Sequence, residues 1–309
     1  MYLNMRRNKV KPLVSIVIPI YNGEEFLKGI YDNFVGQTYE NWEIVFVNDL
    51  STDRTLEIIT EYSRQDKRFR VLDRKEKGGT AVKGLEYALP YCKGDYFFFM
   101  SHDDFIDNNF LEKCIEKAVT TGADTVIPNL IMYYAEDKKD KHGEYPLQND
   151  YEMQLSAREA FGLSLDWQLH GNIFRKMDLV KKIGYKAEYY NSCEYYGRIM
   201  FLHAEKIVFC NTNFYYRQNP NAITKNFHYF QVDILTTDMM LYGVMCQVGY
   251  DKRIREKRLK EITKSFGGWS KTCLRTEMEW RERMYMARAL FKAGLKLPFC
   301  WISLELKKE

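Results

Sequence analysis

The sequence lacks several features that would assign it to a class at once. Its 309 residues contain no apolar stretch near 18 residues, so no membrane-spanning helix is predicted. Residues 1–11 are polar and basic without an apolar core, so a secretory signal is not expected there. The seven cysteines are odd in number and form no Cys-x-x-Cys pair. Reduced thiols in a cytosolic protein are therefore expected in place of a disulfide framework.

The phosphate-binding motifs of common nucleotide enzymes are also missing. Neither Gly-x-Gly-x-x-Gly nor a Gly-Lys-Ser/Thr loop follows the first predicted strand, which disfavours dinucleotide-binding and P-loop proteins. The absence of a Gly-rich, Arg-Lys activating loop disfavours a nucleotidyltransferase. No nucleic-acid-binding motif accompanies the basic residues, so nucleic acid is not an expected partner.

The composition is that of a folded protein with an unevenly distributed charge. An apolar fraction of 46% and an aromatic fraction of 15% exclude disorder, and the length fits one large domain or one domain plus an extension. The net charge is only +4, but residues 251–309 hold sixteen basic and eight acidic residues. A basic tail of this kind favours contact with an anionic surface.

The first hundred residues alternate between short apolar runs and helical apolar spacing. Strands are predicted at 13–20, 42–47, 69–72 and 96–100, and helices at 24–37, 51–62 and 81–89. This alternation predicts an α/β fold with a mostly parallel sheet flanked by crossover helices, a Rossmann-like nucleotide-binding half. A helix at 108–119 and strands at 125–133 and 206–211 follow. The charged segment 135–151 indicates a solvated hairpin or a mobile loop.

Polar residues follow the predicted strands where each strand ends. Asn22 follows the first, Asp49 the second, and Asp103 and Asp104 follow the apolar run at 97–100. The carboxyl ends of parallel strands meet at one edge of a sheet, where ligands bind. Paired carboxylates there can hold a hard divalent cation shared with substrate phosphates. The alternative is that the two aspartates only form a turn and cap the next helix.

Three motifs resemble the family 2 glycosyltransferases in order and spacing. They lie at 14–22 (VSIVIPIYN), 47–55 (VNDLSTDRT) and 94–104 (GDYFFFMSHDD). The resemblance is specific over about residues 12–130 and extends weakly to about 225. It implies a GT-A fold, a nucleotide-sugar donor, a divalent cation (Mg²⁺ or Mn²⁺) and transfer with inversion.

The resemblance also implies roles for individual residues. The donor-binding set would be Pro19, Tyr21, Glu24, Asp49, Ser51, Lys83, Asp103, Asp104 and Arg217. Within this set Asp49 would accept the N–H of a uracil ring, Asp103 would be the metal ligand with Asp104 supporting it, and Arg217 would reach the departing diphosphate. A structural role is the alternative for Arg217. Leu50 and Ser101 depart from the family pattern, which usually has Gly and Asp there, and Ser101 leaves metal binding to Asp103.

The acceptor side of the site is implied less directly. Trp167 would stack on a sugar ring and His170 would contact a phosphate or hydroxyl, whereas a Trp packed in the core is the alternative. Glu194 is the only carboxylate in the segment 191–198, where the family carries its acidic pair. It is the predicted base that deprotonates the acceptor hydroxyl. A surface Glu paired with Arg198 is the competing interpretation.

The family pattern stops near residue 225, which divides the chain into a catalytic domain at 1–225 and a helical, basic extension at 226–309. Helices are predicted at 232–248, 251–264 and 276–293, followed by a tail at 294–306 that mixes aromatic and basic residues. This tail can lie on an anionic membrane, pack on the catalytic domain, or contact a second subunit in a homo-oligomer.

The sequence therefore predicts an inverting, metal-dependent glycosyltransferase of hexosyltransferase type. It would move a sugar from a nucleotide donor, a UDP-sugar, to a glycan or lipid-linked acceptor in bacterial surface polysaccharide biosynthesis. The expected location is cytoplasmic, with peripheral contact at the inner face of the membrane. The alternative is a non-catalytic protein that binds nucleotide sugars. Ser101 and Cys193 favour it, because both stand where the family usually has an acidic residue.

Overall fold

The computed structural model describes residues 11–220 and 225–306, with side chains up to Trp301. The chain forms two compact units. The first comprises residues 1–186 and 196–219, and the second comprises residues 187–195 and 220–309. Among the described helices none combines the length and the apolar character that a membrane crossing requires.

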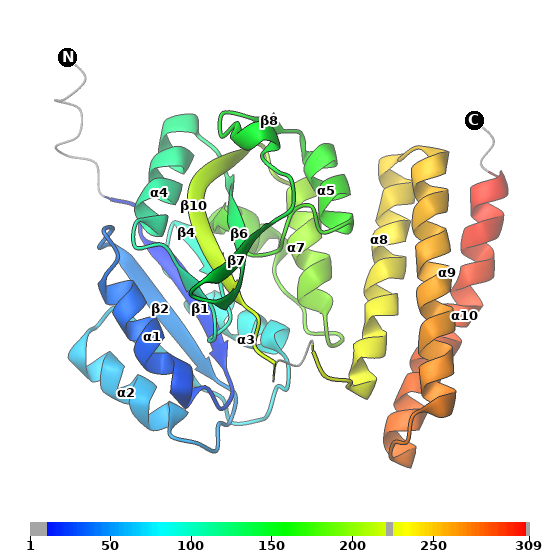
Figure 1. Cartoon of the computed structure of the whole chain (residues 1–309), viewed down its shortest axis with the longest axis horizontal. Helices are drawn as coiled ribbons and strands as arrows, with labels where there is room; N and C mark the ends of the chain where they lie inside the picture. Colours follow the sequence, from blue (N-terminus) through cyan, green and yellow to red (C-terminus); the bar gives the residue numbers. More distant parts are fainter. Residues whose placement is uncertain (1–10, 221–224, 307–309) are drawn as a thin grey trace. The chain divides into compact units, whose positions relative to one another are not determined.

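The first unit is built on one mixed sheet in the order β3-β2-β1-β4-β9-β6-β10-β5, with β7 beside β6 and β8 beside β10 (Figure 1). The strands are β1 Val14–Ile20, β2 Trp42–Asn48, β3 Phe69–Asp73, β4 Tyr96–Phe99, β5 Phe105–Ile106, β6 Thr125–Ala135, β7 Lys138–His142, β8 Gln154–Leu155, β9 Phe174–Lys176 and β10 Ile207–Arg217. The neighbours β3, β2, β1 and β4 are all parallel, as the alternating sequence pattern predicts.

Helices cover the sheet and connect its strands. Those of the first unit are α1 Glu24–Val35, α2 Thr55–Gln65, α3 Ala81–Ala88, α4 Phe110–Thr121, α5 Ala157–Leu165 and α6 Met177–Ile183, and α7 Ser192–Leu202 begins in the second unit and ends in the first. Alternate residues of β1 face opposite sides of the sheet. Val14, Ile16, Ile18 and Ile20 join the core formed with α1, α2 and α4. On the other side α3 packs so closely on Pro19 that a Cβ at Gly84 would lie 2.8 Å from it.

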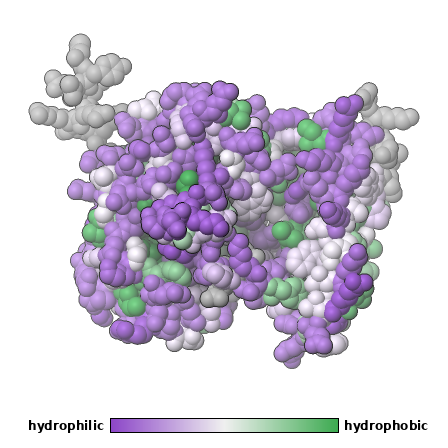
Figure 2. Space-filling view, in the orientation of Figure 1, coloured by the Kyte–Doolittle hydropathy of each residue, from purple (hydrophilic) through white to green (hydrophobic). Residues whose placement is uncertain are grey.

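The charged segment after β6 is a hairpin. β6 continues to Ala135, two residues beyond the predicted strand, and pairs antiparallel with β7. All residues of β7 except His142 are exposed, and this part of the surface is hydrophilic (Figure 2). The hairpin alternative is therefore the correct one for residues 135–142.

The second unit contains three long helices, α8 Ile234–Val248, α9 Lys252–Arg275 and α10 Trp280–Leu306. Met286, Leu290 and Ala293 of α10 pack in one apolar cluster with Cys273 of α9 and Leu235 of α8. A second cluster contains Leu297 of α10, Leu259 and Ile262 of α9, and Tyr242 of α8. The predicted tail at 294–306 is thus the continuation of α10.

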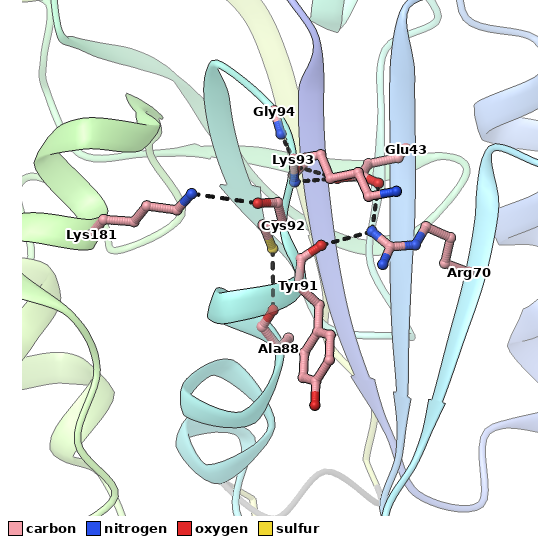
Figure 3. Close-up of polar contacts among 9 residues, drawn as sticks. Glu43, Arg70, Ala88, Tyr91, Cys92, Lys93, Gly94 and Lys181 are labelled. Carbon is pink, nitrogen blue, oxygen red and sulfur yellow. Dashed lines mark hydrogen bonds and ion pairs between the residues drawn. The ribbon is translucent and has the colours of Figure 1, made fainter.

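A buried polar network lies at the amino ends of the strands (Figure 3). Glu43 is 5% exposed, and its carboxylate accepts hydrogen bonds from Ser15 Oγ (2.7 Å), the Lys93 backbone N–H (2.7 Å) and Arg70 Nη1 (2.8 Å). Arg70 Nη1 also donates to the Tyr91 carbonyl at 2.7 Å. The network ties β1, β2 and β3 to the turn before β4.

Candidate functional site

The carboxyl ends of β1, β2 and β3 lie level with one another. Ile20 is paired with Asn48, and Asn48 with Asp73, so the segments that follow these three strands leave the sheet side by side. β4 ends three residues earlier, because Phe99 is paired with Val17. Residues 101–104 therefore run past the last residues of β1 and meet the same edge.

The segments after β1 and β2 are hydrogen-bonded into a clamp, formed by Asn22, Gly23, Glu24 and residues 51–55. Asn22 Oδ1 accepts from the Thr52 N–H (2.8 Å), and Thr55 Oγ1 accepts from the Gly23 N–H (2.9 Å). Glu24 accepts from the Arg54 N–H (2.7 Å), and Asp53 accepts from the Glu24 N–H (3.2 Å). Each segment thus satisfies backbone donors at the start of the other's helix.

Two predicted donor-binding residues belong to this clamp. Ser51 Oγ accepts a hydrogen bond from the Asn22 N–H at 3.0 Å, and the Glu24 carboxylate is used by the Arg54 backbone. Their contacts within the chain fix the loop geometry. A direct role in donor binding stays a prediction for both.

Asp49 holds the loop that follows β3. Its Oδ1 accepts from the Gly78 N–H (2.6 Å) and its Oδ2 from the Gly79 N–H (2.7 Å), and Arg74 Nε lies 3.4 Å from Oδ1. A carboxylate has about four acceptor positions. One acceptor position on Oδ2 thus remains after these contacts. Asp49 can therefore accept one further N–H.

Tyr21 and Lys83 border the same edge. Tyr21 is 40% exposed, and Lys77 Nζ lies 4.1 Å from the centroid of its ring. Lys83 lies in the first turn of α3, half-buried, and its side chain makes no hydrogen bond or ion pair with any described residue. Pro19 is the β1 residue on which α3 packs.

Arg217 contacts Asp103 and Asp104, although more than a hundred residues separate it from them in the sequence. Arg217 ends β10, and its backbone N–H donates to Asp104 Oδ1 at 2.9 Å. Its Nε donates to the Asp103 carbonyl at 2.7 Å. The rings of Phe26, Phe105 and Tyr133 lie 5.1–5.9 Å from the guanidinium carbon. These contacts hold the Arg217 head beside the segment that carries the two carboxylates.

The two carboxylates are unequal in environment. Asp104 is 3% exposed, and burial, followed by the adjacent Asp103 carboxylate, raises its pKa well above the usual range. Its Oδ2 is buried without a hydrogen-bond partner among the described residues. Asp103 is half-buried, and no described residue makes a hydrogen bond or ion pair with its side chain. Asp103 is thus the carboxylate that a ligand can reach.

These residues fit a divalent cation held partly by substrate. No cluster of three or more His, Cys, Asp or Glu side chains within the described ranges is arranged to hold a metal ion. The protein would therefore contribute Asp103, supported by the unpartnered Asp104 Oδ2, and phosphate oxygens would complete the shell. Mg²⁺ in particular is commonly bound by one or two carboxylates plus substrate phosphates.

On the acceptor side, the structure separates Trp167 from His170. Trp167 is 48% exposed with a φ of 58°, and Arg198 lies over its ring at 5.3 Å. The packed-core alternative for this Trp is wrong. His170 is 5% exposed, its Nε2 lies 3.0 Å from the Pro128 carbonyl, and burial lowers its pKa to about 4. This core position speaks against the predicted contact of His170 with the acceptor.

Glu194 lies in the first turn of α7, and its backbone N–H donates to the Asn191 carbonyl at 3.0 Å. The residues around it, 187–195, belong to the second unit. Arg198, four residues later, is buried and its Nε donates to the Ser164 carbonyl at 3.1 Å. The role of Glu194 as base stays a prediction.

The sequence interpretation missed two residues at this edge. Arg74 contacts Asp49 and stacks over Tyr87 (5.6 Å), and its Nη1 is buried without a partner in the described part of the chain. His102 lies beneath Gly23, where a Cβ would come within 2.6 Å of the imidazole. Arg74 directly follows β3, so the rule that selected Asp49 would have found it. His102 carries no such signal, because its contact with Gly23 depends on the fold of the segment after β1.

Comparisons with known proteins agree with this geometry. The family model described as "Glycosyl transferase family 2" matches residues 15–181. The glycosyltransferase GlyG of Streptococcus pneumoniae is 30% identical over 224 residues, which are 69% of this chain and 73% of GlyG. Two further curated relatives are longer, and the chain covers 41% and 54% of them.

Solved glycosyltransferases have the same fold. The structure of S. aureus TarS (residues 1–349) with UDP-GlcNAc superposes with a TM-score of 0.66 at 15% identity, over 91% of this chain and 81% of that one. The mannosyltransferase PcManGT of Pyrobaculum calidifontis, in complex with GDP-Man and Mn²⁺, gives a TM-score of 0.57 at 13% identity, over 94% and 88%. The expected GT-A fold is confirmed, and the chain belongs to glycosyl transferase family 2.

Proposed function

We propose that this glycosyltransferase uses a UDP-sugar and transfers the sugar, with inversion, to a glycan or lipid-linked acceptor. The observation that carries the proposal is the convergence of Asp103, Asp104 and Arg217 at the edge that also holds Asp49. This edge offers an acceptor position for the N–H of a uracil ring, an accessible carboxylate for the cation, and a guanidinium for the diphosphate.

Inverting transfer requires one in-line displacement at the anomeric carbon. The acceptor oxygen forms a bond to that carbon while the bond to the UDP β-phosphate oxygen breaks, and the hydroxyl proton passes to a base, for which we propose Glu194. A divalent cation bound at Asp103 would supply charge stabilisation for the leaving diphosphate. Arg217 would donate to the same phosphate oxygens, because Nε is anchored and the head is held among aromatic rings.

The resemblance also supports a role in bacterial surface polysaccharide biosynthesis, on the inner face of the membrane with peripheral contact. The relatives' names do not specify a sugar acceptor. The acceptor and the linkage are therefore proposed only as a class.

Thermal stabilisation tests the donor class. The purified chain would be heated with UDP-sugars or GDP-mannose, each with Mn²⁺ or with a chelator. We expect UDP-sugars plus Mn²⁺ to raise Tm and GDP-mannose to have little effect, because guanine presents a different hydrogen-bonding edge to Asp49. Equal stabilisation by both donors would contradict the assigned role of Asp49.

Replacement of Asp103 tests the cation site. Asp103→Ala should lower the rate of sugar transfer, measured as the rate of UDP release, roughly a thousandfold. The reason is that several kcal/mol of leaving-group stabilisation would be lost. Asp137→Ala, on the exposed hairpin, is the control and should retain activity. A fully active Asp103→Ala variant would remove the metal hypothesis. Donor binding without turnover by the wild type across a broad acceptor panel would instead favour the non-catalytic alternative.

A further inference from the structure

Helix α10 has two apolar faces, and only one of them is used in packing. Met286, Leu290, Ala293 and Leu297 are all at most 8% exposed and lie in the apolar clusters with α8 and α9. Phe291, Leu295 and Phe299 are 68%, 55% and 72% exposed. Their spacing of four residues places them along one side of the helix. A row of large, exposed apolar side chains is unusual on the surface of a soluble protein and marks an interaction site.

Basic side chains accompany this row. Arg288, Lys292 and Lys296 are exposed and also follow a four-residue spacing, adjacent to the apolar row. None of the three makes an ion pair within the described residues. Residues 283–304 contain four basic residues and no acidic one. We call Arg288, Phe291, Lys292, Leu295, Lys296 and Phe299 together the α10 face.

Three of the nine basic residues of α9 are paired locally. Lys257 and Lys260 lie within ion-pair distance of Glu261 and Glu256, and Arg258 pairs with Asp238 at 2.7 Å. The three basic residues of the α10 face have no such pairs among the described residues, and they adjoin an exposed apolar row, so their charge is available to an anionic partner. On the bundle, hydrophobic residues appear among hydrophilic ones (Figure 2).

We propose that the α10 face docks on the surface of a bilayer containing anionic phospholipid. The phenyl and leucyl side chains would enter the boundary between headgroups and acyl chains, and the basic side chains would extend to the lipid phosphates. Exposed aromatic rings along one side of a helix suit a deformable lipid surface. Pro298, next to Phe299, has no N–H to donate to the Gly294 carbonyl.

The inference deepens the proposed membrane contact by naming the surface that makes it. It does not depend on transfer, because vesicle binding is measured without donor or acceptor. The inner leaflet of a membrane attracts basic segments by its negative surface potential. The α10 face would thus keep the enzyme at the surface where a lipid-linked acceptor is found.

Vesicle flotation of the full chain tests the inference. Vesicles of phosphatidylcholine alone would be compared with vesicles of equal amounts of phosphatidylcholine and phosphatidylglycerol. The wild type should float with the anionic vesicles, and less so as salt increases. The triple variants Phe291→Ala/Leu295→Ala/Phe299→Ala and Arg288→Gln/Lys292→Gln/Lys296→Gln should each bind about tenfold more weakly or worse.

A matched variant separates the α10 face from overall charge. Lys257→Gln/Lys260→Gln/Lys264→Gln removes the same charge from exposed positions on α9 and should bind anionic vesicles within about threefold of wild type. Circular dichroism and stabilisation by UDP-sugar would show that each variant is folded and binds donor. Such donor binding tests the proposed function separately.

Three outcomes would overturn the inference. The wild type would show no preference for anionic vesicles, or the α9 variant would lose binding as strongly as the α10 variants. In the third, light scattering would find that the wild type is a dimer and the Phe291→Ala/Leu295→Ala/Phe299→Ala variant is a monomer, while both bind lipid equally. That result would assign the face to a second copy of this chain.

Discussion

At the scale of single residues, Leu50 adopts an unfavourable backbone conformation beside Asp49. Its φ is 60°, in the left-handed region that costs an L-residue about 1–2 kcal/mol. The family pattern usually has glycine here. We expect Leu50→Gly to raise the free energy of unfolding by about 0.5–1 kcal/mol, because relief of strain exceeds the added freedom of glycine in the unfolded chain. Urea denaturation would measure the change.

A second exposed leucine provides the comparison for Leu50. Leu147 is 42% exposed against 39% for Leu50, but it is not among the residues with positive φ. Leu147→Gly should therefore lower the stability. If both glycine variants were less stable than the wild type, strain at Leu50 would not be the dominant effect.

Burial of His170 should make the free energy of unfolding depend on pH. Burial lowers its pKa from 6.5 to about 4, so the unfolded chain takes up the proton first as the pH falls. The free energy of unfolding should therefore decrease from about pH 6.5 to pH 4, by about 3 kcal/mol from this residue alone. His170→Gln should flatten the profile of unfolding free energy in this window.

His203→Gln is the control for this pH profile, because residue 203 lies on the exposed surface. Chemical denaturation at several pH values between 7 and 4 would compare the three proteins. A His170→Gln profile as steep as that of the wild type would contradict a buried neutral imidazole.

The sequence predicted single site residues where they follow strands. Asp49, Asp103 and Asp104 do so, and the structure brings the last two to Arg217. It did not predict that Asp104 would be the more buried carboxylate, because this depends on β10, which arrives from more than a hundred residues away. It also could not distinguish the exposed Trp167 from the buried His170 three residues later.

At the scale of elements, the clamp connects the starts of α1 and α2. The buried Thr55 accepts the Gly23 N–H through Oγ1, and valine has the same shape without that acceptor. Thr55→Val should lower the free energy of unfolding by about 1–3 kcal/mol, because a buried N–H loses its partner. The affinity for UDP-sugar should also fall, since the Tyr21 loop would be less well positioned.

Thr60→Val is the matched substitution within α2. Thr60 Oγ1 donates to the Leu56 carbonyl at 2.6 Å, so its removal leaves no buried donor unsatisfied. Denaturation and donor titration of both variants would test the clamp. Equal effects of the two substitutions would mean that the Gly23 contact has no special role.

The predicted elements agree best where apolar spacing is strong and least well at their ends. The helix expected at 276–293 continues to Leu306 as α10, although Gly294 and Pro298 normally favour termination. Tertiary packing explains the continuation. A Cβ at Gly294 would lie 3.3 Å from the Phe266 ring, so the glycine permits close helix packing, and Leu297 beyond it is buried in the bundle.

At the scale of the whole molecule, the order of the sequence does not describe the two units completely. The main boundary lies between Asn219 and Pro220, and residues 187–195 join the helices although they precede β10. The sequence boundary at 225 depends on where the family resemblance ends. No local sequence pattern shows that residues 187–195 belong with the helices at 234–306.

We expect removal of the Glu43 carboxylate from its polar network to lower the overall stability strongly. Glu43→Ala would leave the buried Ser15 hydroxyl and the Lys93 N–H without their acceptor, and Arg70 Nη1 with only the Tyr91 carbonyl. We expect the free energy of unfolding to fall by about 3–5 kcal/mol. Glu57→Ala, which breaks an exposed pair with Arg54, should cause no measurable change in the same thermal or urea denaturation. Wild-type stability of Glu43→Ala would contradict the assigned importance of the network.

The network around Glu43 thus differs from the polar groups at the carboxyl ends of the strands. Every contact around Glu43 is closed within the chain, whereas Asp104 Oδ2 and Arg74 Nη1 have no partner among the described residues. The consequence is a separation of mutant phenotypes. In a genetic screen, substitutions near Glu43 should produce temperature-sensitive alleles with low protein abundance. Substitutions near Asp103 should produce abundant protein that is inactive at every temperature.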